Sequence, residues 1–453
     1  MYSISIFLLL VLSVAGCIQA TKRPVMLLFF LVITATVRPS GNIGSFDFSS
    51  LWLLYLIFLC LFVLITKKAN KRSQVILEKL VIFFLFYCIV SPLFFFFDST
   101  TPSYAARVLL KLLYPFLVMF IGYRFLESTK DFATIIKVSL ITTFIFSLFI
   151  GGVPYLFFPK LCFFFSRMTW GYASFSDHTA IITSLALVSW KAYGKKRYLW
   201  LAIYLCISTV LMQNRTGIMA TGIGISVFVL LYYRKSLSVP SLLGVYFLIM
   251  SALLLMPGMS SHMFYNPDDA NIQQIISSPT SIDISNINSS GRFDMWKYLM
   301  DTFFWPRPLF GSGLGASQLF LTSYPYLFGV NHPHSDYVRL LSDTGLIGLT
   351  LYLLIIATIM MYAIKTRRGK PQNHPASICS GFVLCSFPSL LVVMGFDSAT
   401  NCATAVTQFP FIFSGFMLAM TNVFEQKMQI HGTEGTNRVR RYPKRKIYVK
   451  PLP

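Results

Sequence analysis

The feature that most constrains this chain is a succession of long apolar runs that fills most of its 453 residues. Hydrophobic residues make up 55% of the chain and charged residues only 12%, whereas soluble domains ordinarily carry roughly a quarter charged residues. Such runs predict an all-α polytopic membrane protein, in which most of the chain lies in lipid. The composition excludes a soluble globular protein and a disordered chain.

The apolar runs are the candidate membrane spans. A spanning helix needs about 20 residues and several runs are shorter, so we predict about 12 spans, give or take one. Only Thr21-Lys22-Arg23 separates the first two runs, which leaves the side of the N-terminus open. The runs occupy approximately residues 4–20, 24–37, 51–66, 75–97, 106–122, 132–152, 179–193, 198–213, 216–233, 239–256, 336–364, 377–395 and 403–422.

The net charge of +22 comes from 38 Lys and Arg against 16 Asp and Glu. In a soluble protein this excess would suggest nucleic acid, but in a membrane protein the loop cations set the topology. Clusters of cations follow successive spans at alternate ends, so we predict that these loops are cytoplasmic and that nucleic acid is not a partner. The clusters are Lys67, Lys68, Lys71 and Arg72; Lys191, Lys195, Lys196 and Arg197; Arg234 and Lys235; and Lys365, Arg367, Arg368 and Lys370.

This topology divides the chain into four parts. The cations of the last part outnumber its two acidic residues, Glu425 and Glu434, so that part is predicted to be cytoplasmic and to meet anionic headgroups. The long polar segment 257–335 then faces outward. The parts are an N-terminal transmembrane bundle (1–256), an outward-facing loop (257–335), C-terminal transmembrane helices (336–422) and a basic cytoplasmic tail (423–453).

The outward-facing loop contains a predicted amphipathic helix at 292–304, which either lies on the membrane surface or caps the spans. Arg292 falls in its first turn, where the helix dipole disfavours a cation unless an anion binds there as well. Arg292 is therefore an anion ligand or a solvated arginine. The apolar residues that recur at helical spacing are Phe293, Trp296, Met300 and Phe303.

Arg215 lies in the short turn 213–217 between two apolar runs, at the outer end of both. A charge at a membrane span is costly and usually functional, and the arginine fork suits bidentate binding of phosphate. The competing interpretation is an arginine that snorkels into the headgroups. Arg107 and Lys111, one turn apart in another span, line the same cavity or snorkel in the same way.

The densest polar cluster is Asn331-His332-Pro333-His334-Ser335-Asp336-Tyr337. Pro333 suits the first helical position, which predicts that His334 lies in the first turn of a helix, where the dipole keeps its imidazole neutral. A neutral imidazole accepts the proton of a sugar hydroxyl as a general base. Alternatively, the histidines only cap the helix, or they bind a metal ion, for which the sequence places no further ligands.

Three other patterns are set aside. The glycines of Gly311-Ser312-Gly313-Leu314-Gly315 follow no strand, so they predict a tight turn and not a dinucleotide site. Asp343-Thr344-Gly345 imitates an aspartic protease triplet, but it lies in an apolar helical context without a second copy. The 8 Cys form no Cys-x-x-Cys pair and sit mostly in apolar runs, so we predict neither a disulfide framework nor a zinc site.

Four of these features occur together in a known order. They are the turn Asn214-Arg215-Thr216-Gly217, the segment 292–315 with its Arg, Trp, Pro and Gly-x-Gly, the segment 334–349, and many spans with one long outer loop late in the chain. The combination resembles the superfamily of bacterial O-antigen polymerases and O-antigen ligases. The segment 334–349 is similar to that superfamily's His-Asn-x-Tyr-Leu…Glu-x-Gly-Leu-Ile-Gly signature. Ser335 departs from the usual Asn, and Asn214 from the usual Ser.

The resemblance implies a GT-C-like fold in the bacterial inner membrane, with the active site facing the periplasm. It implies a metal-independent glycosyltransferase without a cofactor, whose donor is a glycan on undecaprenyl pyrophosphate. His334 would deprotonate the acceptor hydroxyl, and Arg215 and Arg292 would hold the pyrophosphate. The candidates for supporting or sugar contacts are His332, Tyr337, Asp177, His178, Arg107 and Lys111.

Three functions compete on this basis. The first is a polymerase that extends O-antigen, capsule or exopolysaccharide, with a chain-length regulator and membrane lipid as partners. The second is a ligase that transfers the finished chain to lipid A-core. We favour the polymerase because the superfamily's polymerases are more numerous and diverse. The third is a flippase or other transporter, which predicts inverted repeats and broken spans near the midplane; the sequence shows neither.

Overall fold

The computed structural model describes residues 11–36, 42–67, 75–94, 101–158, 172–233, 292–325, 330–399 and 406–435, together with 160 and 162 and apart from 12, 19–21, 44–45, 127 and 369. The predicted span at 239–256, much of the one at 4–20, the loop before Arg292 and the tail beyond Gly435 lie outside these residues.

The described part of the chain is helical, with one short exception. Each apolar run between residues 24 and 233, and each of the last three runs, falls on a helix. The exception is a pair of two-residue antiparallel strands, β1 (Asn42–Ile43) and β2 (Phe46–Asp47). The helices are α2 (Pro24–Thr36), α3 (Phe48–Thr66), α4 (Val75–Phe94), α5 (Pro102–Phe125), α6 (Thr129–Ile150), α7 (Gly152–Phe157), α9 (Tyr172–Tyr193), α10 (Lys196–Leu211), α11 (Arg215–Tyr233), α15 (Arg292–Leu299), the π-helical η3 (Met300–Phe304), α16 (Ala316–Ser323), α18 (Asp336–Arg368), α19 (Pro375–Phe396) and α20 (Gln408–Gly435).

Within these residues, 6 helices are long and apolar enough to cross a membrane. Shorter apolar helices accompany them at Pro24–Thr36, Ser50–Thr66 and Gln408–Thr421. The chain is therefore a polytopic membrane protein by length and composition, and the count of about 12 spans stays a prediction. The long candidates are Ile76–Leu93, Pro102–Phe125, Thr129–Pro154, Arg215–Tyr233, Asp336–Arg368 and Pro375–Phe396.

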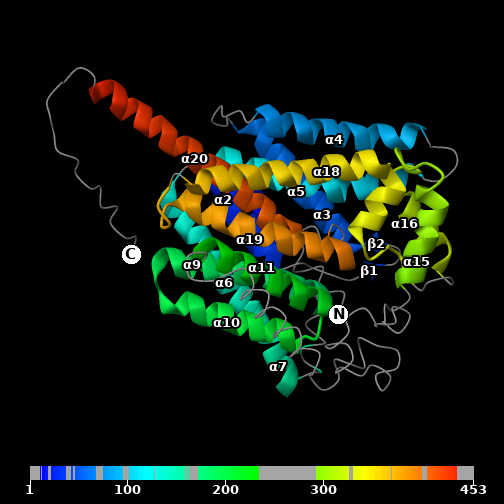
Figure 1. The fold of residues 1–453 in the computed structure, drawn as a ribbon, viewed down its shortest axis with the longest axis horizontal. Helices are drawn as coiled ribbons and strands as arrows, with labels where there is room; N and C mark the ends of the chain where they lie inside the picture. Colours follow the sequence, from blue (N-terminus) through cyan, green and yellow to red (C-terminus); the bar gives the residue numbers. More distant parts are fainter. Residues whose placement is uncertain are drawn as a thin grey trace.

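The helices run side by side along the long axis of the molecule (Figure 1). Helices from the two ends of the chain interleave: α5 packs on α20, α4 on α18, and α11 on α19. The regions predicted as an N-terminal bundle and as C-terminal helices thus form one bundle. Helix α20 continues to Gly435, into the segment predicted as the tail.

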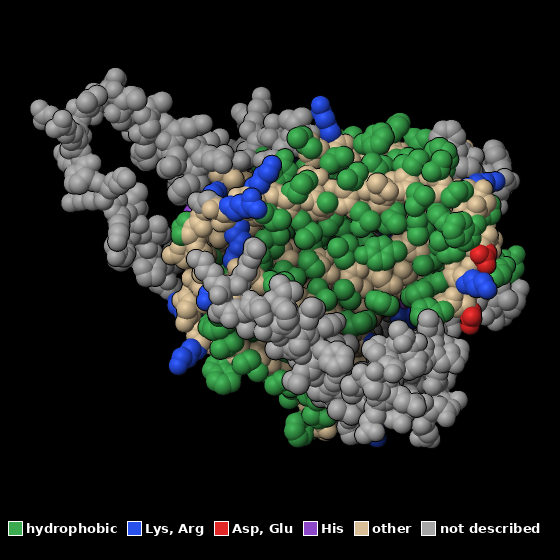
Figure 2. Space-filling view, viewed as in Figure 1, with side chains coloured by type: hydrophobic (Ala, Val, Ile, Leu, Met, Phe, Trp, Pro, Cys, Tyr) green, Lys and Arg blue, Asp and Glu red, His purple; other side chains and the backbone are tan. Residues whose placement is uncertain are grey.

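The side chains are distributed as a lipid solvent requires. Large apolar side chains such as Phe58 and Leu93 are exposed on the outer faces of the helices, and Figure 2 shows them covering one flank of the bundle. Small polar residues, in contrast, are buried between helices. A Cβ atom at Gly122 of α5 would lie 2.9 Å from the carbonyl oxygen of Ile412 on α20. Small residues let membrane helices approach closely, and Gly122 does so here for α5 and α20.

The two ends of the bundle differ in charge. Lys365, Arg367 and Arg368 lie in the last turn of α18, at the end of the bundle where cations gather in Figure 2. Helices α15 and α16 pack at the opposite end, beside the start of α18 (Figure 1). This arrangement agrees with the sidedness that the loop cations predict.

The predicted amphipathic helix at 292–304 is present as α15 followed by η3, and it caps the end of the bundle. Of its predicted apolar residues, Phe303 is buried and Trp296 and Met300 are half-buried, but Phe293 is not covered. Met295 and Leu299 are buried, whereas Phe293 is 41% exposed. The π-helical segment adds a residue to the turn, so that the backbone N–H of Trp305 bonds to Met300. Both Phe303 and Phe304 are then buried.

The Gly311–Gly315 segment is a turn, as predicted, and it docks on α18. The Asp343 carboxylate accepts hydrogen bonds from the backbone N–H groups of Gly315 and Ser317, each 2.9 Å long, at the start of α16. Helix α18 kinks at Gly345 (φ 66°, ψ −167°). The backbone N–H of Leu346 there bonds to Pro308. The protease-like triplet therefore has a structural role that its motif does not suggest.

Candidate functional site

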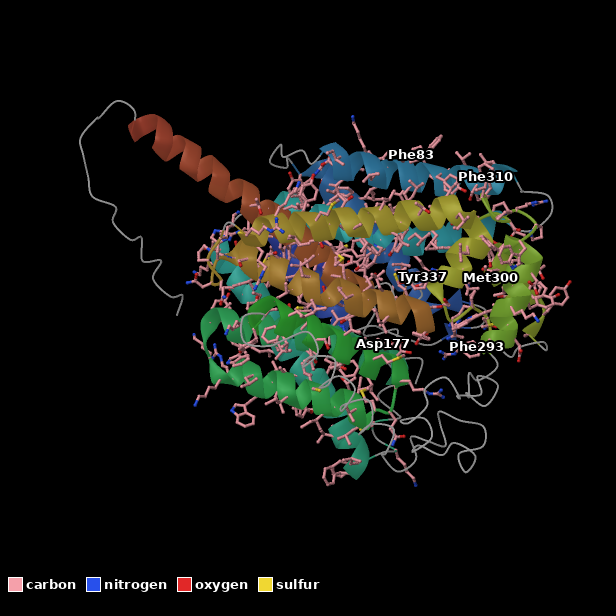
Figure 3. All side chains as sticks on the ribbon, viewed as in Figure 1. Phe83, Asp177, Phe293, Met300, Phe310 and Tyr337 are labelled. Carbon is pink, nitrogen blue, oxygen red and sulfur yellow. The ribbon has the colours of Figure 1, made fainter. Side chains whose placement is uncertain are left out.

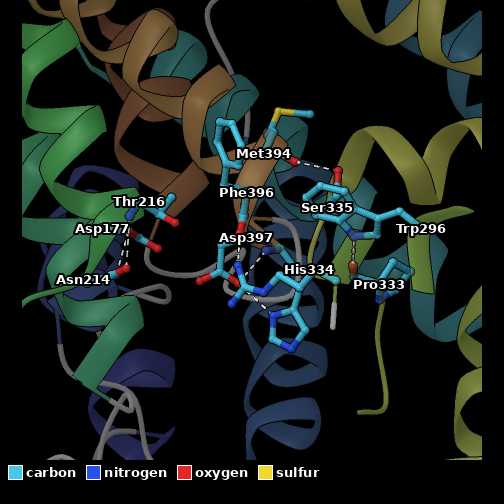
Figure 4. A network of polar contacts seen from close by, with 12 residues as sticks. Asp177, Asn214, Thr216, Trp296, Pro333, His334, Ser335, Met394, Phe396 and Asp397 are labelled. Atoms are coloured by element: carbon cyan, nitrogen blue, oxygen red, sulfur yellow. Dashed lines mark hydrogen bonds and ion pairs between the residues drawn. The ribbon is translucent and has the colours of Figure 1, made fainter. Parts of the chain in front are cut away.

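A group of polar side chains gathers at the end of the bundle that α15 caps (Figures 3 and 4). Its members come from segments far apart in the sequence. They are held between the start of α9, the turn between α10 and α11, the start of α15, the segment before α18 and the end of α19. We call this group the polar cluster; it consists of Asp177, Asn214, Arg215, Arg292, His332, His334 and Asp397.

His334 occupies a different position from the one predicted. Helix α18 begins at Asp336, and the Ser335 hydroxyl caps it by accepting a 3.4 Å hydrogen bond from the N–H of Val338. His334 precedes the helix in a left-handed conformation with φ 52°. Such a conformation costs a non-glycine residue on the order of 1–3 kcal/mol, so the surrounding structure must hold it. His334 is therefore not in the first turn of α18, and the predicted effect of the helix dipole on its imidazole is wrong.

The partner of His334 is a carboxylate. Nδ1 of His334 lies 3.3 Å from Oδ1 of Asp397, and the two side chains are 23% and 21% exposed. If Nδ1 donates its proton to Asp397, Nε2 is left as the proton acceptor. Burial alone would raise the pKa of Asp397, but its hydrogen bonds to His334 and to the Ser398 N–H, with the charge of Arg292, hold this pKa below its usual value.

Asp397 was not among the residues singled out in the sequence. It directly follows Phe396, the last residue of α19, so the apolar run that ends near residue 395 delivers it to the same end of the bundle as His334. The only signal was an acidic residue at the outer end of a predicted span. The guanidinium of Arg292 donates a hydrogen bond to the Phe396 carbonyl oxygen, which ties α15 to this corner of the cluster.

Arg215 is the first residue of α11 and is half-buried. The side chain of Asn214 caps this helix, because its oxygen accepts a 3.2 Å hydrogen bond from the N–H of Thr216. The amide of Asn214 also donates a 3.2 Å hydrogen bond to Asp177, which is only 2% exposed. Asn214 thus fixes the turn to α9. Ser is usual at this motif position, and Asn, like Ser, is a residue that can cap a helix.

The two arginines are close enough for their charges to interact. The positive charge of Arg292 disfavours the charged form of Arg215. The same charge favours the charged forms of Asp177 and Asp397. Each arginine also begins a helix, α11 or α15, where the partial positive charge of the peptide dipoles adds to its own. Two cations at two helix N-termini make this corner of the cluster suited to an anion with several oxygens.

Of the remaining candidates, His332 lies near His334 and Lys111 lies near His332, whereas Arg107 has a different contact. The His332 and His334 rings are 4.1 Å apart between centroids. Burial lowers the pKa of His332 to about 3, assisted by the charges of His334 and Lys111. Lys111 is thus near enough for its charge to act on His332. Arg107 is exposed and stacks over Tyr104, with 5.4 Å from its guanidinium carbon to the ring centroid.

Two predicted contacts have other partners in the structure. The hydroxyl of Tyr337 donates a 2.9 Å hydrogen bond to the Leu391 carbonyl oxygen, so this side chain fastens α18 to α19. His178 is buried inside the bundle, where Nε2 lies 3.2 Å from the hydroxyl of Thr143 and the ring packs against Phe409. Its neighbour Asp177, in contrast, belongs to the cluster.

Two further contacts brace the cluster. The indole of Trp296 donates a 2.6 Å hydrogen bond to the Pro333 carbonyl oxygen, which links α15 to the segment before α18. Asp336 and Arg339 form a buried ion pair of 2.8 Å in the first turn of α18.

Across the described residues, no three His, Cys, Asp or Glu side chains gather in a way that could hold a metal ion.

Comparison with known proteins supports the superfamily that the motifs indicate. The family model described as O-antigen ligase matches residues 199–353. The match includes Arg215, Arg292, His332 and His334, whereas Asp177 and Asp397 lie outside it. No curated protein matches the chain.

Proposed function

We propose that this chain, a member of the O-antigen polymerase and ligase superfamily, transfers glycan from undecaprenyl pyrophosphate to a sugar hydroxyl at the periplasmic face of the inner membrane. The observation that carries the proposal is the polar cluster. It combines a histidine held by a carboxylate with two arginines at helix N-termini. These are the groups that transfer from a pyrophosphate requires: a base for the acceptor and cations for the leaving group.

The proposed reaction is a single displacement. The acceptor hydroxyl oxygen attacks the anomeric carbon of the donor sugar and passes its proton to Nε2 of His334. The bond between that carbon and the pyrophosphate oxygen breaks, and the pyrophosphate leaves with the electron pair. Attack from the face opposite the leaving group inverts the anomeric carbon. Asp397 stabilises the imidazolium that forms, because its carboxylate faces Nδ1.

Arg215 and Arg292 would hold the pyrophosphate and neutralise the charge that develops on it. Arginine binds phosphate oxygens in pairs through its planar fork, which a lysine does not do as well. Two such side chains can supply this stabilisation without a divalent cation. Transfer by the purified protein is therefore expected to be insensitive to EDTA, and loss of activity in EDTA that returns with Mg²⁺ would contradict this part of the proposal.

The acceptor distinguishes two versions of this function. A repeat-unit polymerase uses a growing glycan, as we predict from the sequence, and an O-antigen ligase uses lipid A-core. The description of the matching family model favours the ligase as the second candidate. Deleting the gene for this chain and separating the cell's glycans on a gel distinguishes the polymerase from the ligase. A single repeat on lipid A-core indicates a polymerase, and full-length chains left on the lipid carrier indicate a ligase.

Point variants test the chemistry itself. His334→Ala and Arg215→Ala should abolish transfer while the protein still inserts into the membrane. Lys297→Ala, which removes an exposed cation from α15, is the matched control and should leave transfer unchanged. Glycans of normal length and attachment in both site variants would refute the assignment and reopen the transporter alternative.

A further inference from the structure

Lys137 lies on the outer surface of the bundle, away from the polar cluster. It is exposed on α6, and it follows Thr129, the first residue of that helix, by about 12 Å at the helical rise per residue. Charged side chains this far along a lipid-facing helix are costly unless they reach the headgroups or a counter-charge. The position of Lys137 therefore calls for a specific explanation.

An apolar groove opens beside Lys137, between α6 and α10. Its volume is about 670 Å³, within the range of about 300–1,000 Å³ that is usual for ligand sites. Leu140 and Tyr198 at the groove are buried, whereas Ile141 and Trp200 are exposed along it. One side of the groove is closed where the hydroxyl of Tyr204 on α10 bonds to the Ser147 carbonyl oxygen of α6.

The charges of the groove are confined to one end. Arg197 is in the first turn of α10 and Lys137 lies across the groove on α6. None of the described residues that line the groove is acidic. This end belongs to the side that Lys195 and Lys196 mark as cytoplasmic. Trp200 is 66% exposed, and tryptophan is enriched where membrane spans meet the headgroups. Two cations therefore border an apolar groove at headgroup depth.

We propose that this groove binds an anionic glycerophospholipid of the cytoplasmic leaflet. The phosphate lies between Lys137 and Arg197, and an acyl chain lies along Leu140, Ile141 and Phe144. The arrangement favours an anionic lipid over a zwitterionic one because the lining offers two cations to the phosphate and, among its described residues, no carboxylate. The glycan donor does not fit this role, since its pyrophosphate is proposed to bind at the opposite end of the bundle.

Lipid binding can be measured on the full chain in detergent. Native mass spectrometry would follow bound dioleoyl phosphatidylglycerol and dioleoyl phosphatidylcholine, added in equal amounts. The wild type should retain the anionic lipid preferentially. Each of Lys137→Gln and Arg197→Gln should weaken this binding about fivefold, which corresponds to about 1 kcal/mol per cation near an anionic headgroup. Lys365→Gln with Arg368→Gln, which removes two exposed cations from α18, is the matched control.

A second measurement locates the lipid. Brominated phosphatidylglycerol in nanodiscs should quench the fluorescence of the wild type more than that of Trp200→Phe. Ile141→Trp, which fills the groove without changing its charge, should reduce lipid retention. Equal retention of both lipids by the wild type, or unchanged anionic binding in the Lys137 and Arg197 variants, would overturn the proposal. The same is true if the control variant loses as much binding as they do.

Discussion

The imidazole of His334 and the carboxylate of Asp397 meet at 3.3 Å, although 63 positions separate them in the sequence. Helix α18 carries the chain away from His334 along the bundle, and α19 packs against α18 and brings it back. The contact thus depends on the whole α18–α19 hairpin. It places a carboxylate where it can orient the ring and leave Nε2 available as a proton acceptor.

Asp397→Asn should lower kcat by at least about tenfold with little change in KM, since the amide no longer stabilises the imidazolium formed in the transition state. The loss should be smaller than in His334→Ala, which forfeits the whole contribution of a general base, about 10²–10⁴-fold. Initial rates of transfer with purified protein would test this. Asp301→Asn, a change at an exposed carboxylate of η3, is the control. A wild-type kcat in Asp397→Asn would exclude a positioning role.

Asn214→Ala should destabilise the protein by about 1–3 kcal/mol, because it removes the cap of α11 and leaves the buried Asp177 without this amide donor. Asn214→Ser should cost less, since a hydroxyl can still accept from the N–H of Thr216. Thermal unfolding in detergent would rank the two variants. Equal stability of the wild type and Asn214→Ala would show that the turn does not depend on this side chain.

Asp343→Ala should destabilise the docking of the Gly311–Ser317 segment by about 3–6 kcal/mol, from two hydrogen bonds to a charged acceptor. Limited proteolysis and thermal unfolding would both detect the change. Ser342→Ala is the comparison, because its buried hydroxyl has no hydrogen-bond partner among the described residues. A larger effect in Ser342→Ala than in Asp343→Ala would contradict the docking role.

His374 predicts a dependence of stability on pH. Its Nδ1 accepts a 3.1 Å hydrogen bond from the N–H of Ala376 and caps α19, which only the unprotonated nitrogen can do. Burial lowers the pKa of His374 to about 4, and the charge of Lys370 contributes. As the pH falls, His374 is protonated in the unfolded chain before it is protonated in the folded one. The contribution of His374 to folding stability is therefore complete above about pH 6.5 and is lost progressively as the pH falls towards 4.

Thermal unfolding between pH 4 and 8 would measure this dependence. His374→Asn keeps a capping side chain but does not titrate, so its melting temperature should fall less on acidification. His374→Ala should lose about 1 kcal/mol at neutral pH, the usual value of an N-cap. A wild-type pH dependence in His374→Asn would assign the effect to other groups.

Much of the site was predictable because its signals are local. A charge in a short turn between apolar runs singled out Arg215, a Pro and two His before a span singled out His332 and His334, and apolar spacing found the helix at 292–304. The parts that failed depend on packing. In the sequence, Pro333 and Ser335 are equally good markers of a helix start. In the structure, the Ser335 hydroxyl accepts the hydrogen bond from the N–H of Val338, so the helix begins after Ser335 and His334 precedes it.

The sequence by itself determined that the chain is a helical membrane protein, which side its cations mark, and which arginines and histidine are candidates. Apolar length and charge position suffice for these conclusions, since lipid leaves the backbone no alternative to helices or closed barrels. Only the tertiary structure decided that Asp397 partners His334, that Asp177 supports the Arg215 turn and that His178 turns inward. Those outcomes follow from how distant helices pack. The sequence of each helix is an apolar run, and this run does not specify which other helix it packs against.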